Sequence, residues 1–246
     1  MHQIIQHRQF ASRNLVYGFL GVHPDISNHR YRGHKEAEKN REKVLKILDC
    51  NQSYISILKQ VHGVRCAALN SSEDIDYDYE GDAQITKSRD IILATQTADC
   101  VPVLFCDQLA GVVGAAHAGW RGALDGVLNS TLREMKESGA NLCNITAVIG
   151  PCIRQDSYEV DRDFIDRFLF EDIQNSKFFE KSESNMDKYF FDLPGYVAEI
   201  LAHDRVQQIF DVKINTFNDP RFFSYRRSCL AKKELSGYNL SLIGLQ

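Results

Sequence analysis

Three short segments of the sequence each place a strong transition-metal ligand at the end of an apolar run, beside glycine or another small residue. The segments are KQVHG, TADC and HAGWRG, and their ligands are His62, Cys100 and His117. Imidazole and thiolate groups suit zinc, and two histidines with one cysteine leave the fourth position of a tetrahedral site open. Zinc lowers the pKa of a water bound there to about 7. The three ligands are far apart in the sequence, however, so each could also be an ordinary buried thiol or a hydrogen-bonded histidine.

Two arginines are candidates for binding a substrate anion. Arg121 lies in HAGWRG, where glycines flank the only tryptophan, Trp120, before an expected helix. A helix N-terminus offers free backbone N–H groups and a positive dipole end, which bind anions. Arg121 therefore fits a phosphate ligand or a structural ion-pair partner, whereas Trp120 is assigned to packing. Arg226 follows the apolar run FFSY and fits anion binding or a surface salt bridge equally well.

Other polar residues near the three segments are expected to support the structure. Asp99 directly precedes Cys100. Because neighbouring residues of a strand point to opposite faces, Asp99 is expected to orient backbone or a ligand rather than to bind a metal. Asp82 and Asp192 are assigned structural roles, and Cys106 is assigned to the core.

Short β-rich runs and helical patterns alternate along the chain and must position these residues. Residues 91–119 form buried apolar runs, with a turn expected at 107–111, where glycine supports the reversal. Residues 123–139 change to a helical period, and Gly139 is the expected stop. Strands and helices interleave without a strict βαβ rhythm, which predicts an α+β or mixed α/β fold in one domain, residues 1–246. The remaining expected elements are a charged helix at 35–48, a strand at 145–151, helices near 161–170 and 194–204, and a last strand at 241–245.

Composition argues against several classes of partner. The chain has 246 residues, of which 43% are hydrophobic and 25% charged, as is ordinary for a soluble globular protein. Its formal net charge is −4 and it has no block of basic residues, so we expect no nucleic-acid partner. No apolar stretch approaches the roughly 20 residues that span a bilayer, and the N-terminus is too polar for a signal peptide. The seven cysteines form no CxxC pair, which predicts free thiols in a cytoplasmic protein without membrane association.

A series of motifs resembles a known family. The motifs are KQVHG at 59–63, DAQIT at 82–86, TADCVPVLFCD at 97–107, AAHAGWRG at 115–122, IGPCI with SYEV at 149–160, and FFSYRR at 222–227. Together they are similar to the YfiH-like family, whose members are also described as laccase-domain or multicopper polyphenol oxidases, purine nucleoside phosphorylases and peptidoglycan editing factors. The resemblance implies a mixed αβ sandwich with His62, Cys100 and His117 as zinc-binding and catalytic residues. It also implies phosphorolysis of adenosine, inosine and methylthioadenosine, with adenosine deamination.

The N-terminal part departs from this family. Family members carry an arginine followed by a GGVS-like turn, whereas residues 18–34 read GFLGVHPDISNHRYRGH. Arg30 and Arg32 are the residues that could replace the family's substrate-binding arginine. Near the C-terminus the usual Cys-Thr is Asn-Thr at 215–216, and the usual Thr-Gly-Arg is replaced within residues 232–237. We expect these later changes to affect packing more than chemistry.

The motifs leave several functions open. The first is a zinc-dependent enzyme that takes purine nucleosides and phosphate, as a monomer or a small homo-oligomer. A laccase-like polyphenol oxidase fits less well, because a multicopper site needs many histidines in His-x-His pairs, and the chain has eight histidines and no such pair. One copper could still bind adventitiously, since copper outcompetes zinc at most such sites. The third is an amidase that edits a peptidoglycan precursor, with Cys100 as nucleophile and His62 or His117 as base. A metal-binding adaptor is the fourth.

Overall fold

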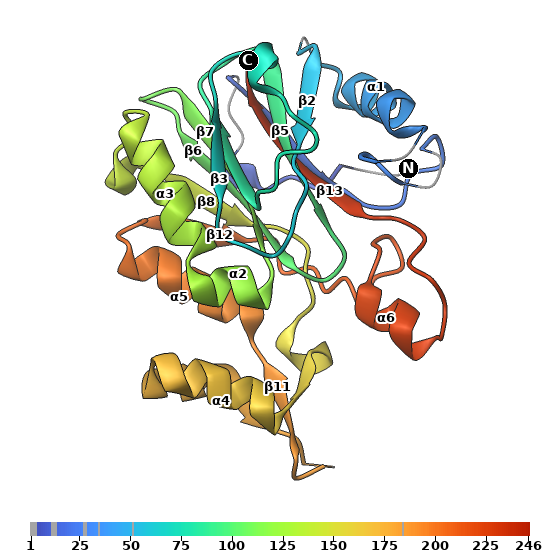
Figure 1. Cartoon of the computed structure of the whole chain (residues 1–246), viewed down its shortest axis with the longest axis vertical. Coiled ribbons are helices and arrows are strands. Elements are labelled where there is room, and N and C mark those ends of the chain that lie inside the picture. Colours follow the sequence, from blue (N-terminus) through green and yellow to red (C-terminus); the bar gives the residue numbers. More distant parts are fainter. Residues whose placement is uncertain (1–3, 11–13, 27–28, 34, 51, 184) are drawn as a thin grey trace.

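Two mixed β-sheets pack face to face in the computed structural model, which describes every residue except 1–3, 11–13, 27–28, 34, 51 and 184 (Figure 1). Within these described residues, the larger sheet has six strands in the order β12-β8-β6-β7-β4-β3, and the smaller has four in the order β1-β13-β5-β2. Each sheet combines parallel and antiparallel pairs. The strands of the larger sheet are β3 (Cys66–Leu69), β4 (Ala83–Thr86), β6 (Val101–Asp107), β7 (Val112–Ala118), β8 (Thr146–Ile149) and β12 (Gln208–Asp211), and those of the smaller are β1 (Leu15–Leu20), β2 (Tyr54–Ile57), β5 (Ile91–Thr97) and β13 (Asn239–Leu245).

Apolar side chains fill the space between the two sheets. Successive residues of a strand point to opposite faces, so alternate residues of each strand face inward. Leu93 of β5 and Leu104 of β6 are buried there beside Tyr17 and Phe19 of β1. Cys106 lies in the same core, as the sequence predicted. This close packing fixes the sheets against each other, so the loops at their ends keep a constant spacing.

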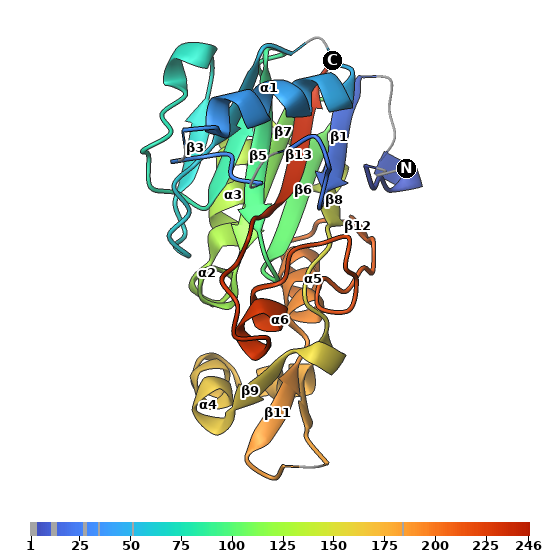
Figure 2. The ribbon, with the colours of Figure 1, turned by 90° about the vertical axis from the view of Figure 1, so that its right-hand side faces the viewer.

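Helices cover both outer faces of the sandwich. Helix α1 (Ala37–Leu48) lies over the four-stranded sheet and buries Val44 against it (Figures 1 and 2). Helices α3 (Val127–Glu137) and α5 (Leu193–His203) cover the six-stranded sheet. The arrangement is the mixed αβ sandwich that the family resemblance implies, and it agrees with the mixed α/β class predicted from the pattern of strands and helices. Among the residues that the structure describes, no helix is both long and apolar enough to cross a membrane.

The helix expected at 123–139 begins earlier and is interrupted. The structure has α2 (Trp120–Asp125) followed by α3, and Gly126 separates them with a φ of 103° in the left-handed region. Glycine adopts this conformation without the steric cost of a Cβ. The apolar spacing continues across the break, so the pattern alone does not reveal it. Gly139, with a φ of 98°, follows the end of α3 as predicted.

The other elements expected from the sequence are confirmed, with boundaries shifted by a residue or more. They all lie in the described part of the chain. These elements are the helix at 35–48, the turn at 107–111, the strands at 145–151 and 241–245, and the helices at 161–170 and 194–204.

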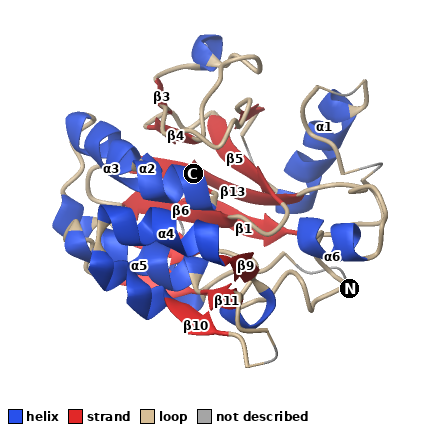
Figure 3. Ribbon diagram, turned by 60° about the horizontal axis from the view of Figure 1, so that its bottom comes forward, coloured by secondary structure: helices blue, strands red, loops and turns tan. Residues whose placement is uncertain are grey.

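A third, smaller sheet that the sequence did not predict lies at one end of the sandwich (Figure 1). Helix α4 (Arg162–Glu171) packs on it through aromatic side chains, with the Phe168 and Phe191 ring centroids 4.8 Å apart. Seen from this end, α2, α4 and α5 lie together and α6 lies on the other side of the strand ends (Figure 3). The elements not yet named are β9 (Glu159–Asp161), β10 (Phe179–Lys181), β11 (Lys188–Phe191), α6 (Tyr225–Leu230) and short 3-10 helices at Arg8–Phe10, Ser72–Asp74, Leu142–Asn144, Gln155–Ser157 and Ile173–Phe178.

Candidate active site

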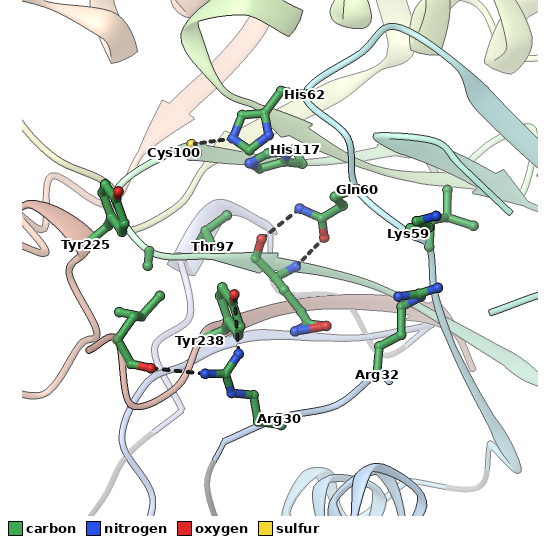
Figure 4. A pocket seen from close by; sticks show the side chains of 14 residues that line it. Arg30, Arg32, Lys59, Gln60, His62, Thr97, Cys100, His117, Tyr225 and Tyr238 are labelled. Atoms are coloured by element: carbon green, nitrogen blue, oxygen red, sulfur yellow. Dashed lines mark hydrogen bonds between the residues drawn. The ribbon is translucent and has the colours of Figure 1, made fainter. Parts of the chain in front are cut away.

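The structure brings His62, Cys100 and His117 together where the strands of the larger sheet end (Figure 4). His62 lies in the loop between β2 and β3, Cys100 directly precedes β6, and His117 is next to the last residue of β7. One potential ligand atom from each residue lies within 4.8 Å of the others, and Cys100 Sγ is 3.8 Å from His62 Nε2. His62 is exposed and His117 is buried. The three residues therefore form one cluster that is open to solvent on the His62 side.

Asp82 holds both histidines of this cluster in place. His117 Nδ1 donates to its carboxylate at 2.8 Å, and both side chains are almost fully buried. The carboxylate also accepts hydrogen bonds from the backbone N–H groups of Val61, His62 and Gly63, at 3.1, 2.9 and 2.8 Å. His62 has a φ of 61°, which a non-glycine residue keeps only when its surroundings hold it there. These hydrogen bonds agree with the structural role that the sequence predicted for Asp82, and they show that the role is to position both histidines.

Asp99 positions the turn that carries Cys100. Its φ is 90°, and its carboxylate accepts hydrogen bonds from the Thr216 and Ser224 hydroxyls at 2.7 and 3.0 Å. A third hydrogen bond comes from the backbone N–H of Arg226 at 2.7 Å. The prediction that Asp99 orients backbone is confirmed. Through these bonds, the turn is fixed to the first turn of α6.

The glycines of HAGWRG are needed where two segments approach closely. A Cβ at Gly119 would lie 2.7 Å from His62 Cδ2 and 3.3 Å from Cys100 Sγ. A Cβ at Gly122 would lie 2.8 Å from the carbonyl oxygen of Gly63. The absence of side chains therefore lets α2 pack against the loop that carries His62. The sequence predicted an anion site at the N-terminus of this helix. Because α2 has only six residues, its helix dipole is short and adds little to anion binding there.

The buried charges of the cluster stabilise one another. Burial raises the pKa of Cys100, but the adjacent His117 and His62 outweigh this effect and lower it to about 6. Burial lowers the pKa of His117, but the Cys100 thiolate and the Asp82 carboxylate outweigh this effect and raise it to about 9. Against its own burial, hydrogen bonds from His117 and the backbone hold the pKa of Asp82 below its usual range. Near neutral pH, the metal-free cluster is therefore a thiolate–imidazolium pair.

Metal-free protein should be alkylated selectively at Cys100. Only the thiolate reacts with iodoacetamide, so the lowered pKa predicts a rate that rises with pH through about 6 and then levels off. Burial raises the pKa of Cys106 and Cys152, which keeps them as unreactive thiols. The rates can be measured by mass spectrometry in a Cys143→Ser/Cys229→Ser background, which removes the exposed thiols. A midpoint near the ordinary thiol value of about 8.5 would contradict the pairing.

Two cavities meet at His62 and Cys100. One has a volume of about 540 Å³ and includes Arg30; we call it the Arg30 cavity. The other has a volume of about 470 Å³ and includes Arg121; we call it the Arg121 cavity. Both volumes fall within the range of small-molecule sites, about 300–1,000 Å³. The cluster therefore lies at the junction of two spaces that are each large enough for a reactant.

Arg121 and Arg226 line the Arg121 cavity, and their positive charges are available to a bound anion. The Arg121 guanidinium carbon lies 4.9 Å from the Trp120 ring centroid, and that of Arg226 lies 5.5 Å from the Tyr158 ring centroid. In the described part of the chain, neither arginine forms an ion pair with a carboxylate. This favours anion binding over the alternative of structural salt bridges. Trp120 packs on Phe164 with ring centroids 4.9 Å apart, as expected, and also lines this cavity.

Arg30 and Arg32 both line the Arg30 cavity, but they differ in their partners. Arg32 forms an ion pair with Asp78 at 2.8 Å. Arg30 donates to the Leu235 carbonyl at 3.0 Å and lies over the Tyr238 ring, 5.1 Å from its centroid. Of the two arginines that could replace the family residue, Arg30 is therefore the one that forms no ion pair with the residues that the structure describes. Leu235 belongs to the C-terminal segment that departs from the family, so this segment contacts the cavity and is not limited to packing.

The donor set of the cluster fits a zinc ion. The 3.8 Å between Cys100 Sγ and His62 Nε2 is close to the separation of two ligands that bind one tetrahedral zinc at about 2.0–2.3 Å. His117 uses Nδ1 to bind Asp82, which leaves Nε2 for the metal, in the carboxylate–histidine arrangement common behind metal ligands. Three ligands would leave one position open to a molecule from either cavity.

Known proteins are similar to the chain over most of its length. The family model described as multi-copper polyphenol oxidoreductase laccase matches residues 24–246. A purine nucleoside phosphorylase of Rickettsia conorii is 41% identical over 175 residues, which cover 71% of each chain. Another, from Rickettsia prowazekii, is 36% identical and covers 82% of this chain and 84% of its own. The crystal structure of the Bacillus licheniformis hypothetical protein YfiH matches with a TM-score of 0.78 at 29% identity, covering 94% of this chain and 93% of that one. The chain therefore belongs to the YfiH-like, laccase-domain family, and it has the fold of that family.

Proposed function

We propose that the chain is an enzyme that cleaves purine nucleosides by phosphorolysis at His62, Cys100 and His117. The observation that carries this proposal is the meeting of two cavities at the cluster, because a reaction of two substrates needs both within reach of the same atoms. The guanidinium groups of Arg121 and Arg226 form no ion pair with a carboxylate among the described residues, and they suit inorganic phosphate. The relatives named purine nucleoside phosphorylases support the choice of substrate.

Phosphorolysis exchanges the bond between ribose C1′ and purine N9 for a bond between C1′ and a phosphate oxygen. The base leaves with the electron pair of the broken bond, and the proton of hydrogen phosphate ends on the base. Arg121 would orient the phosphate and neutralise its charge. His62, Cys100 and His117 would hold zinc, which supplies Lewis-acid polarisation when bound. Burial and Cys100 raise the pKa of Tyr158, so its hydroxyl stays protonated beside the reactants and can donate a hydrogen bond.

Inosine should release hypoxanthine only when phosphate is present, with an equal amount of ribose 1-phosphate. Mass spectrometry on protein of known metal content checks both products. Arg121→Gln should raise the KM for phosphate by about tenfold or more, because a hydrogen bond to a charged group contributes about 1.5–3 kcal/mol. Release that does not depend on phosphate would make the enzyme a hydrolase. No release from any purine nucleoside would overturn the proposal.

Protein made without added metal should contain about one zinc per chain. The double variant Cys100→Ala/His117→Ala removes two of the three ligands and should retain less than about a tenth of that zinc. Elemental analysis of both proteins measures the difference, with Cys143→Ala as the control because that thiol is exposed. Stoichiometric zinc in the double variant would place the metal elsewhere.

A cysteine-dependent amidase is the second candidate, favoured by the thiolate–imidazolium pair of the metal-free cluster. A thiolate beside a histidine is the usual arrangement of a thiol nucleophile and its base. Zinc makes a bound thiolate a poor nucleophile, so amide hydrolysis would occur only without metal.

Adenosine deamination would use the position that three zinc ligands leave open, and ammonia release from adenosine tests it. Polyphenol oxidation is not favoured, because the metal-ligand cluster found among the described residues has only three members.

A further inference from the structure

We propose that the substrate carries an anionic group of its own, the 5′-phosphate of a purine nucleotide, and that the Arg30 cavity binds this group. The inference rests on the proposed phosphorolysis and specifies its substrate class. Its first support is the charge of the cavity wall. Arg30, Arg32 and Lys59 line the Arg30 cavity, and none of the described residues lining it is acidic. A wall of this kind attracts anions and repels cations.

Among the three cationic side chains, Arg30 is the one without an ion-pair partner in the described part of the chain, so its charge is available to a ligand. Arg32 and Lys59 are each ion-paired at 2.8 Å with an acidic residue that does not line the cavity. Among the described residues, Arg30 donates to neutral groups alone, the Leu235 carbonyl at 3.0 Å and the Tyr238 hydroxyl at 3.5 Å. These hydrogen bonds orient the guanidinium group without neutralising it. A guanidinium has five N–H donors, so several remain for the oxygens of a phosphate.

Arg30 and the cluster lie on opposite sides of one cavity, where one ligand can contact both. In Figure 4, His62, Cys100 and His117 occupy one side of the cavity, and the Arg30 guanidinium group occupies the other, beside Tyr238. A volume of about 540 Å³ holds a molecule of nucleotide size. A nucleotide whose glycosidic bond lies at the cluster would direct its 5′-phosphate along the cavity toward Arg30.

Inorganic phosphate alone does not account for this second cationic wall. Arg121 and Arg226 already provide two guanidinium groups in the other cavity. With phosphate bound there, a neutral nucleoside would leave Arg30 uncompensated in a partly enclosed space, whereas a 5′-phosphate would form charge-assisted hydrogen bonds with it. The reaction remains balanced: the nucleotide and hydrogen phosphate give free purine and ribose 1,5-bisphosphate. The 5′-phosphate itself is unchanged.

Inosine 5′-monophosphate and inosine should be compared as substrates and as ligands of the zinc-loaded full chain. We expect kcat/KM for the nucleotide to exceed that for inosine by about tenfold or more. Arg30→Gln should lower the ratio of these two values by about tenfold, and Arg30→Lys should restore part of it by keeping the charge. Arg121→Gln is the matched control in the other cavity, and it should raise the KM for phosphate while leaving the ratio within about twofold.

Two results would overturn this inference while leaving phosphorolysis standing. One is a nucleotide that is neither bound nor cleaved better than inosine. The other is an Arg30→Gln variant whose main defect is its KM for inorganic phosphate, which would assign the Arg30 cavity to the second substrate. If neither compound is cleaved, the proposed function fails, and calorimetric binding of the two compounds to wild type and Arg30→Gln still decides whether the charge of Arg30 selects the anionic one, with Arg30→Lys as the variant that keeps the charge.

Discussion

Replacing Cys100 with alanine should reduce the kcat of inosine phosphorolysis by well over tenfold. The thiolate lies at the junction of the two cavities, 3.8 Å from His62 Nε2, so its removal affects both the metal site and the reactants. His62→Ala should have an effect of the same order. Each tenfold loss corresponds to about 1.4 kcal/mol of transition-state stabilisation. Steady-state kinetics at saturating phosphate, together with zinc content, measure the loss.

Cys100→Ser separates chemistry from packing in this experiment. A serine hydroxyl nearly preserves the shape of the thiol, but it stays protonated near neutral pH and binds zinc poorly. We expect the serine variant to be nearly as inactive as the alanine variant, with thermal unfolding close to that of the metal-free wild type. Cys143→Ala, at an exposed position, should keep full activity. A Cys100→Ser variant with more than about a third of wild-type kcat would remove Cys100 from the mechanism.

The three clustered ligands could be predicted because their residue types and their motifs agree. Cys100 and His117 stand at strand ends, and the loop between β2 and β3 brings His62 to them. The residues that hold these ligands in place by hydrogen bonds are harder to recognise in the sequence. The hydrogen bond from the Arg226 N–H to Asp99 joins residues 127 positions apart, and only the folded chain reveals it. Asp82 had one visible signal, its place directly before the buried strand of the DAQIT motif.

The fold also decides which charged side chains that line each cavity are ion-paired and which are not. Arg30 and Arg32 stand in the same RYR tripeptide and look equivalent in the sequence. Only the folded chain brings Asp78 to Arg32 and leaves Arg30 with neutral partners. The break at Gly126 was missed for a related reason, since the apolar spacing is the same on both sides of it. Local patterns thus identify elements and ligands, whereas pairings between distant segments decide which charges remain free.

Asp82→Asn should weaken zinc binding by about 10–100-fold, the usual effect of removing a carboxylate behind a metal-bound histidine. The asparagine keeps nearly the same shape, but it lacks the charge that orients His117 Nδ1 and accepts the three N–H groups of the His62 loop. Zinc affinity can be measured by competition with a chelator. Because Asp82 positions other residues and does not itself bind zinc or substrate, kcat at saturating zinc should recover in large part.

Asp107→Asn is the matched control, because it tests the loss of a buried carboxylate alone. Asp107 is also 1% exposed and accepts three backbone N–H groups, from Leu109, Ala110 and Asn141, but it lies at the far end of β6 from Cys100. Both variants should lose about 1–3 kcal/mol of unfolding free energy in the metal-free state. Only Asp82→Asn should lose zinc affinity. Equal zinc affinities in the two variants would mean that Asp82 stabilises the fold without positioning the metal ligands.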